Sequence, residues 1–468
     1  MAKWRIEKDS LGEVRVPASA YYGAQTQRAV ENYAISGARA PHALVLACAL
    51  VKKAAARANR DVGDLKPRLA KAIAKAADRV LAGEFADQFV VDAYNSGAGT
   101  SFHMNVNEVL ANVAIEALGG LRGDYSVVHP NDHVNCGQST NDVIPTAIRV
   151  AARVQATALR ATLLGLRAAF RRKAREFDQV LKAGRTHLQD AVPVRLGQEF
   201  GAYAEATEKA LGVLDRCLPS LEELGLGGSA TGTGLNTHPE YAAKAVAYLA
   251  EWTGFEFRVA PDRFEAMQSV APIVELSAAM RGIAVELIRI ANDLRLLSSG
   301  PTSGLAEIRL PAVQPGSSIM PGKVNPSIPE MVNMVCFAVV GNDLTIAMAA
   351  QAGQLELNVM LPVIAYKLLD SLAILSNAVA VFATLCVEGI EADVERCRAY
   401  AERTMGLATA LNPYIGYAAA ARVAKEALAT ARPLRDIVLE KKLLSAGELD
   451  RILDPRAMTE PRARVGKR

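Results

Sequence analysis

The feature that most constrains the fold is the segment of residues 143–177, which reads VIPTAIRVAARVQATALRATLLGLRAAFRRKAREF. Its apolar residues recur at three- and four-residue spacing, and no glycine cluster interrupts them. That spacing is typical of one face of a single long helix. Pro145 is expected in the first helical turn, where its missing amide proton is not needed. Asn141 or Asp142 is expected to cap that turn.

Four further segments repeat this pattern, at residues 196–224, 274–297, 329–351 and 359–386. Alanine and leucine, which are strong helix formers, are frequent throughout, and aromatic residues make up only 5% of the chain. Five long helices joined by polar, glycine-rich segments predict a mainly all-α protein built around a helix bundle. Alanine-rich helix faces pack closely against other helices, so oligomerisation is expected as well.

The composition changes along the chain in a way that predicts three domains. Residues 1–139 are more mixed and are expected to form a mostly helical N-terminal domain. Residues 140–392 hold the long helices of the central bundle domain. Residues 393–468 have shorter helical patterns broken by prolines and are expected to form a small C-terminal helical domain.

Charge and cysteine content exclude several classes of protein. The net charge of +4 is small for 468 residues and argues against nucleic-acid binding. The basic ending RARVGKR is short enough to be a solvated tail. Six scattered cysteines without a CxxC pair indicate a reduced, cytoplasmic protein. Apolar runs such as SLAILSNAVAVFATLC fall short of the roughly 20 residues that span a bilayer, so they are expected to be buried helices.

Polar residues gather in four turn-rich clusters, at residues 96–108, 129–142, 184–190 and 316–326. Together they supply neutral hydrogen-bonding groups, the cationic groups Lys323 and His187, and the free N–H groups of helix starts. Any one cluster alone is better explained by helix caps and turns. Four such clusters on one helical scaffold favour a receptor for a small polyanion such as a dicarboxylate. No cysteine, histidine or aspartate spacing indicates a structural metal.

The amino-acid sequences of these clusters resemble motifs of the fumarase/aspartase superfamily. GSSIMPGKVNP matches the signature loop of that family, and GRTHLQDAVPVRLGQEF, HPNDHVNCGQSTND, GGSATGTGLNT and TALNPYIGY match in the order of the family. The resemblance covers nearly the whole chain. It implies three mostly helical domains, whose central helices form a twenty-helix core in a homotetramer. Each active site would then combine loops from three subunits.

The resemblance also implies a reaction, the reversible elimination across the C2–C3 bond of a succinyl compound to give fumarate. Ser317 would be the base that takes the C3 proton, and an aci-carboxylate intermediate would follow. His187 would contact a substrate carboxylate and Glu330 would support it. The implied substrate contacts are Thr100, Ser101, Ser139, Thr140, Asn141, Thr186, Ser318, Lys323 and Asn325. A second anion-binding element near the site is implied at His129, Asn131 and Asp132.

Local motifs favour one branch of the family. GAGTS, QSTND with Thr140, and AGQLELNVMLPV resemble aspartases, whereas MNVNE and TALNPYIGY resemble fumarases. We therefore expect an aspartate ammonia-lyase, with class II fumarate hydratase as the alternative and a non-catalytic structural homologue as a minor one. No cofactor is expected to be required, and activation by a divalent cation stays open. Neither nucleic acid nor membrane is an expected partner.

Three departures from the family pattern flank these motifs. Phe102-His103 stands where a small polar residue and asparagine are usual, and Cys136-Gly137 replaces a lysine or methionine followed by serine. Thr302 stands where the family has arginine. These positions leave the central residues of the motifs intact. Their effect on the substrate or the loops is open.

Overall fold

The computed structural model describes residues 4–461. The basic stretch RARVGKR, which was expected to be a solvated tail, lies outside the described residues. The chain divides into two compact units. The first comprises Met1–Ala161, Ala210–Val285 and Val335–Asn377, and the second comprises Thr162–Lys209, Glu286–Met334 and Ala378–Arg468. The division into three domains stays a prediction.

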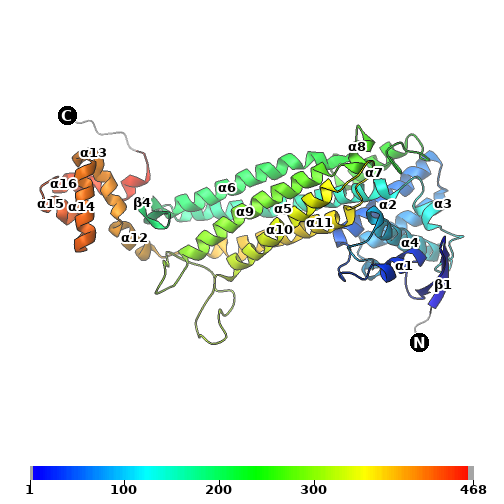
Figure 1. Cartoon of the computed structure of the whole chain (residues 1–468), viewed down its shortest axis with the longest axis horizontal. Helices are drawn as coiled ribbons and strands as arrows, with labels where there is room; N and C mark the ends of the chain where they lie inside the picture. Colours follow the sequence, from blue (N-terminus) through cyan, green and yellow to red (C-terminus); the bar gives the residue numbers. More distant parts are fainter. Residues whose placement is uncertain (1–3, 462–468) are drawn as a thin grey trace. The chain divides into compact units, whose positions relative to one another are not determined.

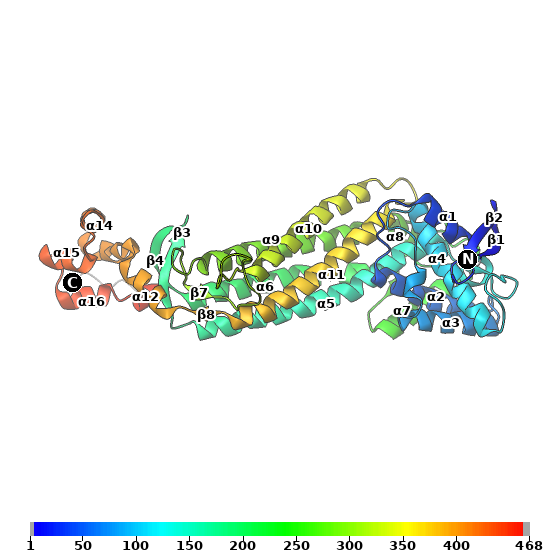
Figure 2. The same cartoon turned by 90° about the horizontal axis from the view of Figure 1, so that it is seen from below.

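Five long helices confirm the mainly all-α fold. They are α5 (Thr140–Glu176), α6 (Leu196–Cys217), α9 (Ala271–Leu297), α10 (Ser327–Gln351) and α11 (Leu361–Leu385). Each contributes residues to both units, and within each unit the helical segments run side by side (Figure 1 and Figure 2). Helix α6 ends at Cys217, earlier than residue 224, and Pro219, which has no N–H to continue the α-helical hydrogen bonds, begins a turn of 3-10 helix over Pro219–Glu222.

The start of α5 differs from the sequence expectation. The helix begins at Thr140, and the capping residue is Ser139, whose Oγ accepts from the N–H of Asn141 at 3.2 Å. In the other direction, the N–H of Ser139 donates a hydrogen bond to Asp142 Oδ1 at 2.9 Å. This reciprocal pair satisfies two free amides of the first turn. Pro145 consequently lies inside the helix rather than in its first turn.

The first unit adds shorter elements around these helical segments. Helices α2 and α3 are separated by Gly63, which takes the left-handed conformation that ends α2, and α3 begins with Pro67 in its first turn. The elements are β1 (Trp4–Asp9), β2 (Gly12–Pro17), α1 (Ala24–Asn32), α2 (His42–Val62), α3 (Pro67–Leu81), α4 (Thr100–Ala117), β5 (Glu223–Leu224), α7 (Tyr241–Thr253), β6 (Arg258–Val259) and α8 (Arg263–Gln268). Strands β1 and β2 pair antiparallel, and β5 pairs parallel with β6.

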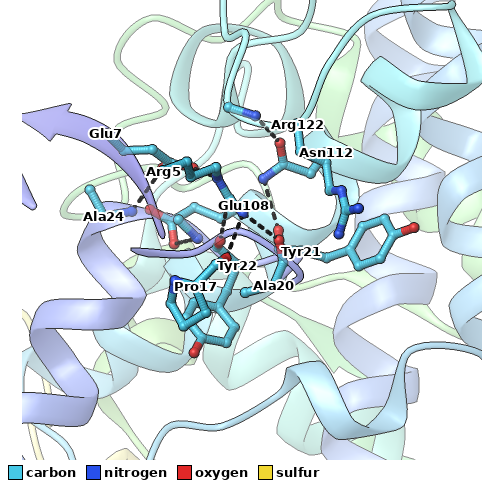
Figure 3. Close-up of polar contacts among 12 residues, drawn as sticks. Arg5, Glu7, Pro17, Ala20, Tyr21, Tyr22, Ala24, Glu108, Asn112 and Arg122 are labelled. Carbon is cyan, nitrogen blue, oxygen red and sulfur yellow. Dashed lines mark hydrogen bonds and ion pairs between the residues drawn. The ribbon is translucent and has the colours of Figure 1, made fainter. Parts of the chain in front are cut away.

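Buried polar contacts fix the N-terminal segment against α4 (Figure 3). The Glu108 carboxylate accepts hydrogen bonds from the amides of Gly23, Gln25 and Thr26. Asn112 donates to the carbonyl of Tyr21 at 2.8 Å. The guanidinium of Arg5 donates to the carbonyls of Pro17, Ala20 and Tyr22. Since these backbone groups belong to irregular chain, side chains replace the ladder partners they lack.

The second unit contains a hairpin, a short strand pair and small helices. Strands β3 (Leu181–Thr186) and β4 (Gln189–Arg195) pair antiparallel, as do β7 (Ile308–Arg309) and β8 (Glu391–Ala392). The remaining helices are α12 (Val394–Arg403), α13 (Asn412–Ile415), α14 (Tyr417–Thr430), α15 (Leu434–Glu440) and α16 (Ala446–Ile452). Leu411, Val423, Ile437 and Leu449 form the core of the last of these helices. Ser445 and Glu448 make a capping box at the start of α16.

Helix α10 and the segment Leu361–Gly389, which contains α11, are long and apolar enough to cross a membrane by length and composition. Core helices of globular proteins satisfy the same two criteria, so this is weak evidence for a membrane protein. Every third or fourth residue of both helices is buried in the protein, which is the periodicity of packed core helices.

Candidate active site

The signature loop places the Ser317 hydroxyl against backbone amides. Ser317 Oγ lies 3.2 Å from the nitrogen of Ile319 and 3.1 Å from the nitrogen of Met320, and both N–H groups donate to it. Two amide donors stabilise negative charge on an oxygen, as they do in an oxyanion hole. Two N–H groups are therefore positioned to stabilise negative charge on the Ser317 oxygen.

Gly316 allows the two ends of this loop to lie close enough to form hydrogen bonds with each other. The N–H of Gly316 donates to the carbonyl of Lys323 at 2.8 Å, and Asn325 Nδ2 donates to the carbonyl of Gly316 at 2.7 Å. A Cβ atom at Gly316 would stand 2.6 Å from the Lys323 oxygen and 2.7 Å from the Asn325 nitrogen. Only glycine allows this approach, so the closed loop depends on its absent side chain. Lys323 is exposed beyond this closure.

Thr186 and His187 lie at the tip of the β3–β4 hairpin. Thr186 pairs with Gln189, so His187 and Leu188 form a two-residue turn. Their φ angles are 54° and 60°, the positive values that a tight hairpin turn requires and that glycine or asparagine usually supplies. Non-glycine residues in this conformation store strain of about 1–3 kcal/mol each and often mark functional sites. The turn holds His187 out on the surface.

Buried ion pairs anchor the base of the same hairpin. Arg185 donates to Glu307 Oε2 at 2.8 Å, and Lys182 Nζ lies 2.8 Å from Glu199 Oε1 and 3.4 Å from Glu307 Oε2. Glu307 has no exposed surface and Lys182 is also buried. Two cations facing two carboxylates keep the cluster close to neutral, which buried charges require. The strand that leads to Thr186 is thus fixed in place.

A second group of polar residues gathers at the N-termini of α4 and α5 in the first unit. Thr100 Oγ1 lies 3.2 Å from Thr140 Oγ1, so the structure brings these two predicted contacts together. His103, which was not among the predicted site residues, lies behind them with Nδ1 2.8 Å from Thr140 Oγ1. The signal for His103 in the sequence was its departure from the asparagine usual at that position.

The start of α5 is tied to the glycine-rich loop that follows α6. Asp142 Oδ2 accepts from the amides of Gly227 at 2.9 Å and Ser229 at 3.2 Å, and Asn141 Nδ2 donates to the carbonyl of Ala230 at 2.8 Å. Burial raises the pKa of Asp142 to about 6, although the backbone donors oppose this shift. The amide of Asn141 is therefore already engaged in holding the loop, while Ser139 serves as the cap.

Lys52 is a buried cation beneath this group that the sequence did not indicate. Its Nζ lies 2.8 Å from Asn135 Oδ1 and 2.9 Å from Gln138 Oε1, and the side chain has no exposed surface. Burial lowers the pKa of Lys52 to about 7, with the charges of Cys48 and Asp142 opposing that shift. Lys52 fixes the chain that leads into Ser139 and Thr140.

The predicted second anion element forms a single turn of π-helix, Pro130–Val134. His129 precedes it, and its Nδ1 accepts from the amides of Asn131 and Asp132 at 3.2 Å each. The Asp132 carboxylate approaches the same nitrogen at 3.5 Å. The three residues are adjacent, and their role in anion binding stays a prediction.

Several predicted residues have free functional groups. Within residues 4–461, the side chains of His187, Lys323 and Glu330 make no hydrogen bond or ion pair, and all three are exposed. The expected contact between Glu330 and His187 is absent from this single described chain. The side chains of Ser101, Thr186 and Ser318 also have no hydrogen-bond partner there. These groups are available to a ligand or to another copy of the chain.

Comparisons with known proteins agree with this architecture. A family model described as Lyase matches residues 12–341, and one described as Fumarase C C-terminus matches residues 407–460. The chain is 48% identical to an aspartate ammonia-lyase of Bacillus subtilis, over 98% of this chain and 97% of that one. It is 53% identical to a class II fumarate hydratase of Halobacterium salinarum, over 97% of both chains.

A solved structure of similar fold is a protein named fumarate lyase:delta crystallin from Brucella melitensis, bound to cobalt. It is 51% identical, covers 98% of this chain and all of its own, and superposes with a TM-score of 0.94. The long-helix fold and the signature loop thus define a helical lyase. The chain belongs to the fumarase/aspartase superfamily.

Proposed function

We propose that this chain is an aspartate ammonia-lyase, which converts L-aspartate into fumarate and ammonia. Ser317 Oγ takes a proton from C3, and the electron pair of the broken C–H bond moves into the adjacent carboxylate to give an aci-carboxylate. That pair then forms the C2–C3 double bond as the C2–N bond breaks and ammonia leaves. Stabilising the doubly charged aci-carboxylate is the largest demand on such a site.

The single observation that supports the elimination chemistry is the environment of Ser317. Its Oγ already accepts two backbone N–H groups, from Ile319 and Met320, before any substrate is bound. In this proposal the same two N–H groups stabilise the alkoxide that Ser317 must become to act as a base. Lys323 and Asn325 from the same loop bind one substrate carboxylate in this proposal, and Ser318 helps to hold the aci-carboxylate.

The remaining site residues divide between the two units. His187 contacts a substrate carboxylate with Glu330 as its support, and Thr186 lies beside it on the hairpin tip. The first unit supplies Thr100, Ser101, Ser139, Thr140 and Asn141 to the substrate, and His129, Asn131 and Asp132 form an accessory anion element. In this proposal different subunits contribute these groups to one site.

An unpartnered face of α10 supports the homotetramer. Phe337, Leu344 and Met348 are exposed at helical spacing, with Phe337 at 60% and Leu344 at 63% of their full surface. Ala338, Gly341 and Ala347 share this exposed face, which carries no charged residue. Such an uncharged stripe at seven-residue spacing is what a helix buries against another helix. We propose that further copies of α10 cover it in a core of long helices.

No cofactor is required in the proposed reaction, because serine, lysine and backbone amides supply its acid–base and electrostatic needs. Among residues 4–461 no group of three or more histidine, cysteine or acidic residues is placed to hold a metal ion. Activation by a divalent cation is tested by comparing turnover with and without a chelator. We place the protein in the cytoplasm, since its six cysteines are all free.

The leaving group is tested by incubating the purified protein separately with L-aspartate and L-malate and following fumarate by its ultraviolet absorbance. Fumarate from aspartate alone, with an equal amount of ammonia, is the expected result. Fumarate from malate alone would establish the class II fumarate hydratase instead. That second candidate is favoured by the 53% identity to the Halobacterium relative. Fumarate from neither would point to the non-catalytic alternative or to another succinyl substrate.

A further inference from the structure

His103 is a buried residue that makes a hydrogen bond with the Thr140 hydroxyl from the interior side. Its side chain is buried, with 1% of its surface exposed, and its Nδ1 is 2.8 Å from Thr140 Oγ1. Thr140 Oγ1 also lies 3.2 Å from Thr100 Oγ1, and Thr100 is exposed. The three side chains form a line that runs from the protein interior to the surface at the start of α4 and α5.

The hydroxyl protons in this line can be assigned from the acceptors. Thr100 Oγ1 is 2.7 Å from the carbonyl oxygen of Gly97, which can only accept. The single proton of the Thr100 hydroxyl is used there, because that contact is shorter than the one to Thr140. The contact between Thr140 and His103 must therefore use either the Thr140 proton or a proton on the histidine ring.

The surroundings of the other ring nitrogen, His103 Nε2, indicate whether Thr140 or His103 is the donor in their hydrogen bond. His103 Nε2 is buried and has no hydrogen-bond partner among residues 4–461. Burial, with the charge of Lys52, holds the pKa of His103 well below its usual range, so the ring is neutral and carries one proton. A buried N–H without an acceptor is rarer in proteins than an unfilled acceptor.

We propose that His103 is a positioning residue whose Nδ1–H donates to Thr140, so that the single Thr140 hydroxyl proton points outward, to Thr100 Oγ1 in the free protein and to a carboxylate oxygen of the substrate once it is bound. With its oxygen already accepting from His103, Thr140 becomes a better donor, because hydrogen bonds in a chain polarise one another. A donor suits a carboxylate and does not suit an ammonium group. The inference rests on the proposed function, in which Thr140 contacts the dicarboxylate.

The test compares two substitutions at His103. His103→Leu has similar size and no hydrogen-bonding group, whereas His103→Asn places an amide N–H close to the position of Nδ1. The control is Asn107→Leu, which removes another buried polar side chain of α4 that does not contact Thr140. For each protein one measures kcat and KM for L-aspartate and the inhibition constant of succinate, a dicarboxylate that lacks the amino group.

The expected result is that His103→Leu raises both KM for aspartate and the inhibition constant of succinate about tenfold, a change of about 1.4 kcal/mol. His103→Asn is expected to keep both within about threefold, since it retains a donor. Asn107→Leu is expected to leave the succinate constant unchanged. Thermal unfolding of each variant shows whether it is folded before its constants are compared.

Two outcomes would overturn the inference. If His103→Leu folds and changes neither constant, His103 has only a packing role. If aspartate is affected and succinate is not, the Thr140 hydroxyl faces the amino group rather than a carboxylate. Failure of the proposed function would look different, because the unmodified protein would then not deaminate aspartate. The succinate measurement, made by calorimetry, would still test His103 in that case.

Discussion

Arg185 donates a 2.8 Å hydrogen bond to the carboxylate of Glu307, 122 residues further along the chain. Glu307 is completely buried, and Lys182 Nζ is 3.4 Å from the same oxygen. Arg185 directly precedes Thr186 in strand β3, so this contact fixes the strand from which the proposed carboxylate-binding turn projects. It is a structural ion pair that supports the turn proposed to bind the substrate.

Glu307→Gln is expected to lower the free energy of unfolding by about 3 kcal/mol, because it leaves Lys182 and Arg185 with an uncompensated buried charge. Turnover is expected to fall as well, since the hairpin loses its anchor. Urea unfolding at fixed protein concentration measures the first effect. The control Glu391→Gln removes an exposed partner of Arg309 and is expected to change stability by less than about 0.5 kcal/mol. Equal effects of the two changes would contradict this.

Ser317→Ala is expected to lower kcat for aspartate by about 10³-fold or more and to leave succinate binding largely intact. The reason is that, in the proposed function, this change removes the base while Lys323 and Asn325 still bind the carboxylate. Steady-state kinetics and calorimetry measure the two quantities. Ser303→Ala, at an exposed serine outside the signature loop, should retain turnover. A Ser317→Ala protein that turns over at a near-normal rate would exclude Ser317 as the base.

The pH dependence of stability is expected to report on Lys52. Its pKa is about 7 in the folded protein, against the ordinary value of 10.5 in the unfolded chain. Between these values the unfolded chain binds one more proton at this site, so the free energy of unfolding rises with pH. The rise from pH 7 to pH 8.5 amounts to about 1.5 kcal/mol from this group. Well below pH 7 the lysine is charged in both states and its contribution is constant.

Lys52→Met is expected to remove this part of the slope, whereas Lys71→Met, at an exposed lysine of α3, should keep it. The measurement is denaturant unfolding at several pH values for all three proteins, and the quantity compared is the difference in slope. Identical slopes for the unmodified protein and Lys52→Met would show that Lys52 is not the group responsible.

Leu344→Lys is expected to dissociate the proposed homotetramer and abolish turnover, because a charged residue in the middle of the apolar face of α10 would be buried between copies. Light scattering after size-exclusion chromatography gives the mass. Leu428→Lys in α14 is a matched control, since Leu428 is 67% exposed. The control is expected to keep both the mass and the activity. A tetramer that tolerates Leu344→Lys would mean that another surface forms the assembly.

Much of the fold could be predicted because helix periodicity is a local property. The backbone hydrogen bonds of α9 or α10 close within the segment itself, so the spacing of apolar residues reports the helix directly. The predicted starts of these helices at residues 274 and 329 fall within three residues of the observed ones. The predicted start of α5 at residue 143 also lies within three residues of the observed one, and the difference arises because Ser139 caps the helix in a reciprocal pair with Asp142.

The candidate site could be predicted only in part. The residues of the signature loop were identified from the sequence motif itself. The contacts of Ser317 with Ile319 and Met320 join residues only two and three positions apart, so a motif can contain both partners. His103 was noticed as a departure and was not assigned a role, because its partner Thr140 lies on another helix.

The sequence by itself determined the long helices, the polar clusters between them and the membership of a lyase family. Each of these features depends on the spacing or identity of residues that are close together in the sequence. Only the tertiary structure decided that Lys52, His103 and Glu307 are buried and which groups they face. The physical reason is that burial and pairing of polar groups depend on segments far apart in the chain. The pKa of a lysine or histidine, and hence its chemistry, follows from those distant neighbours.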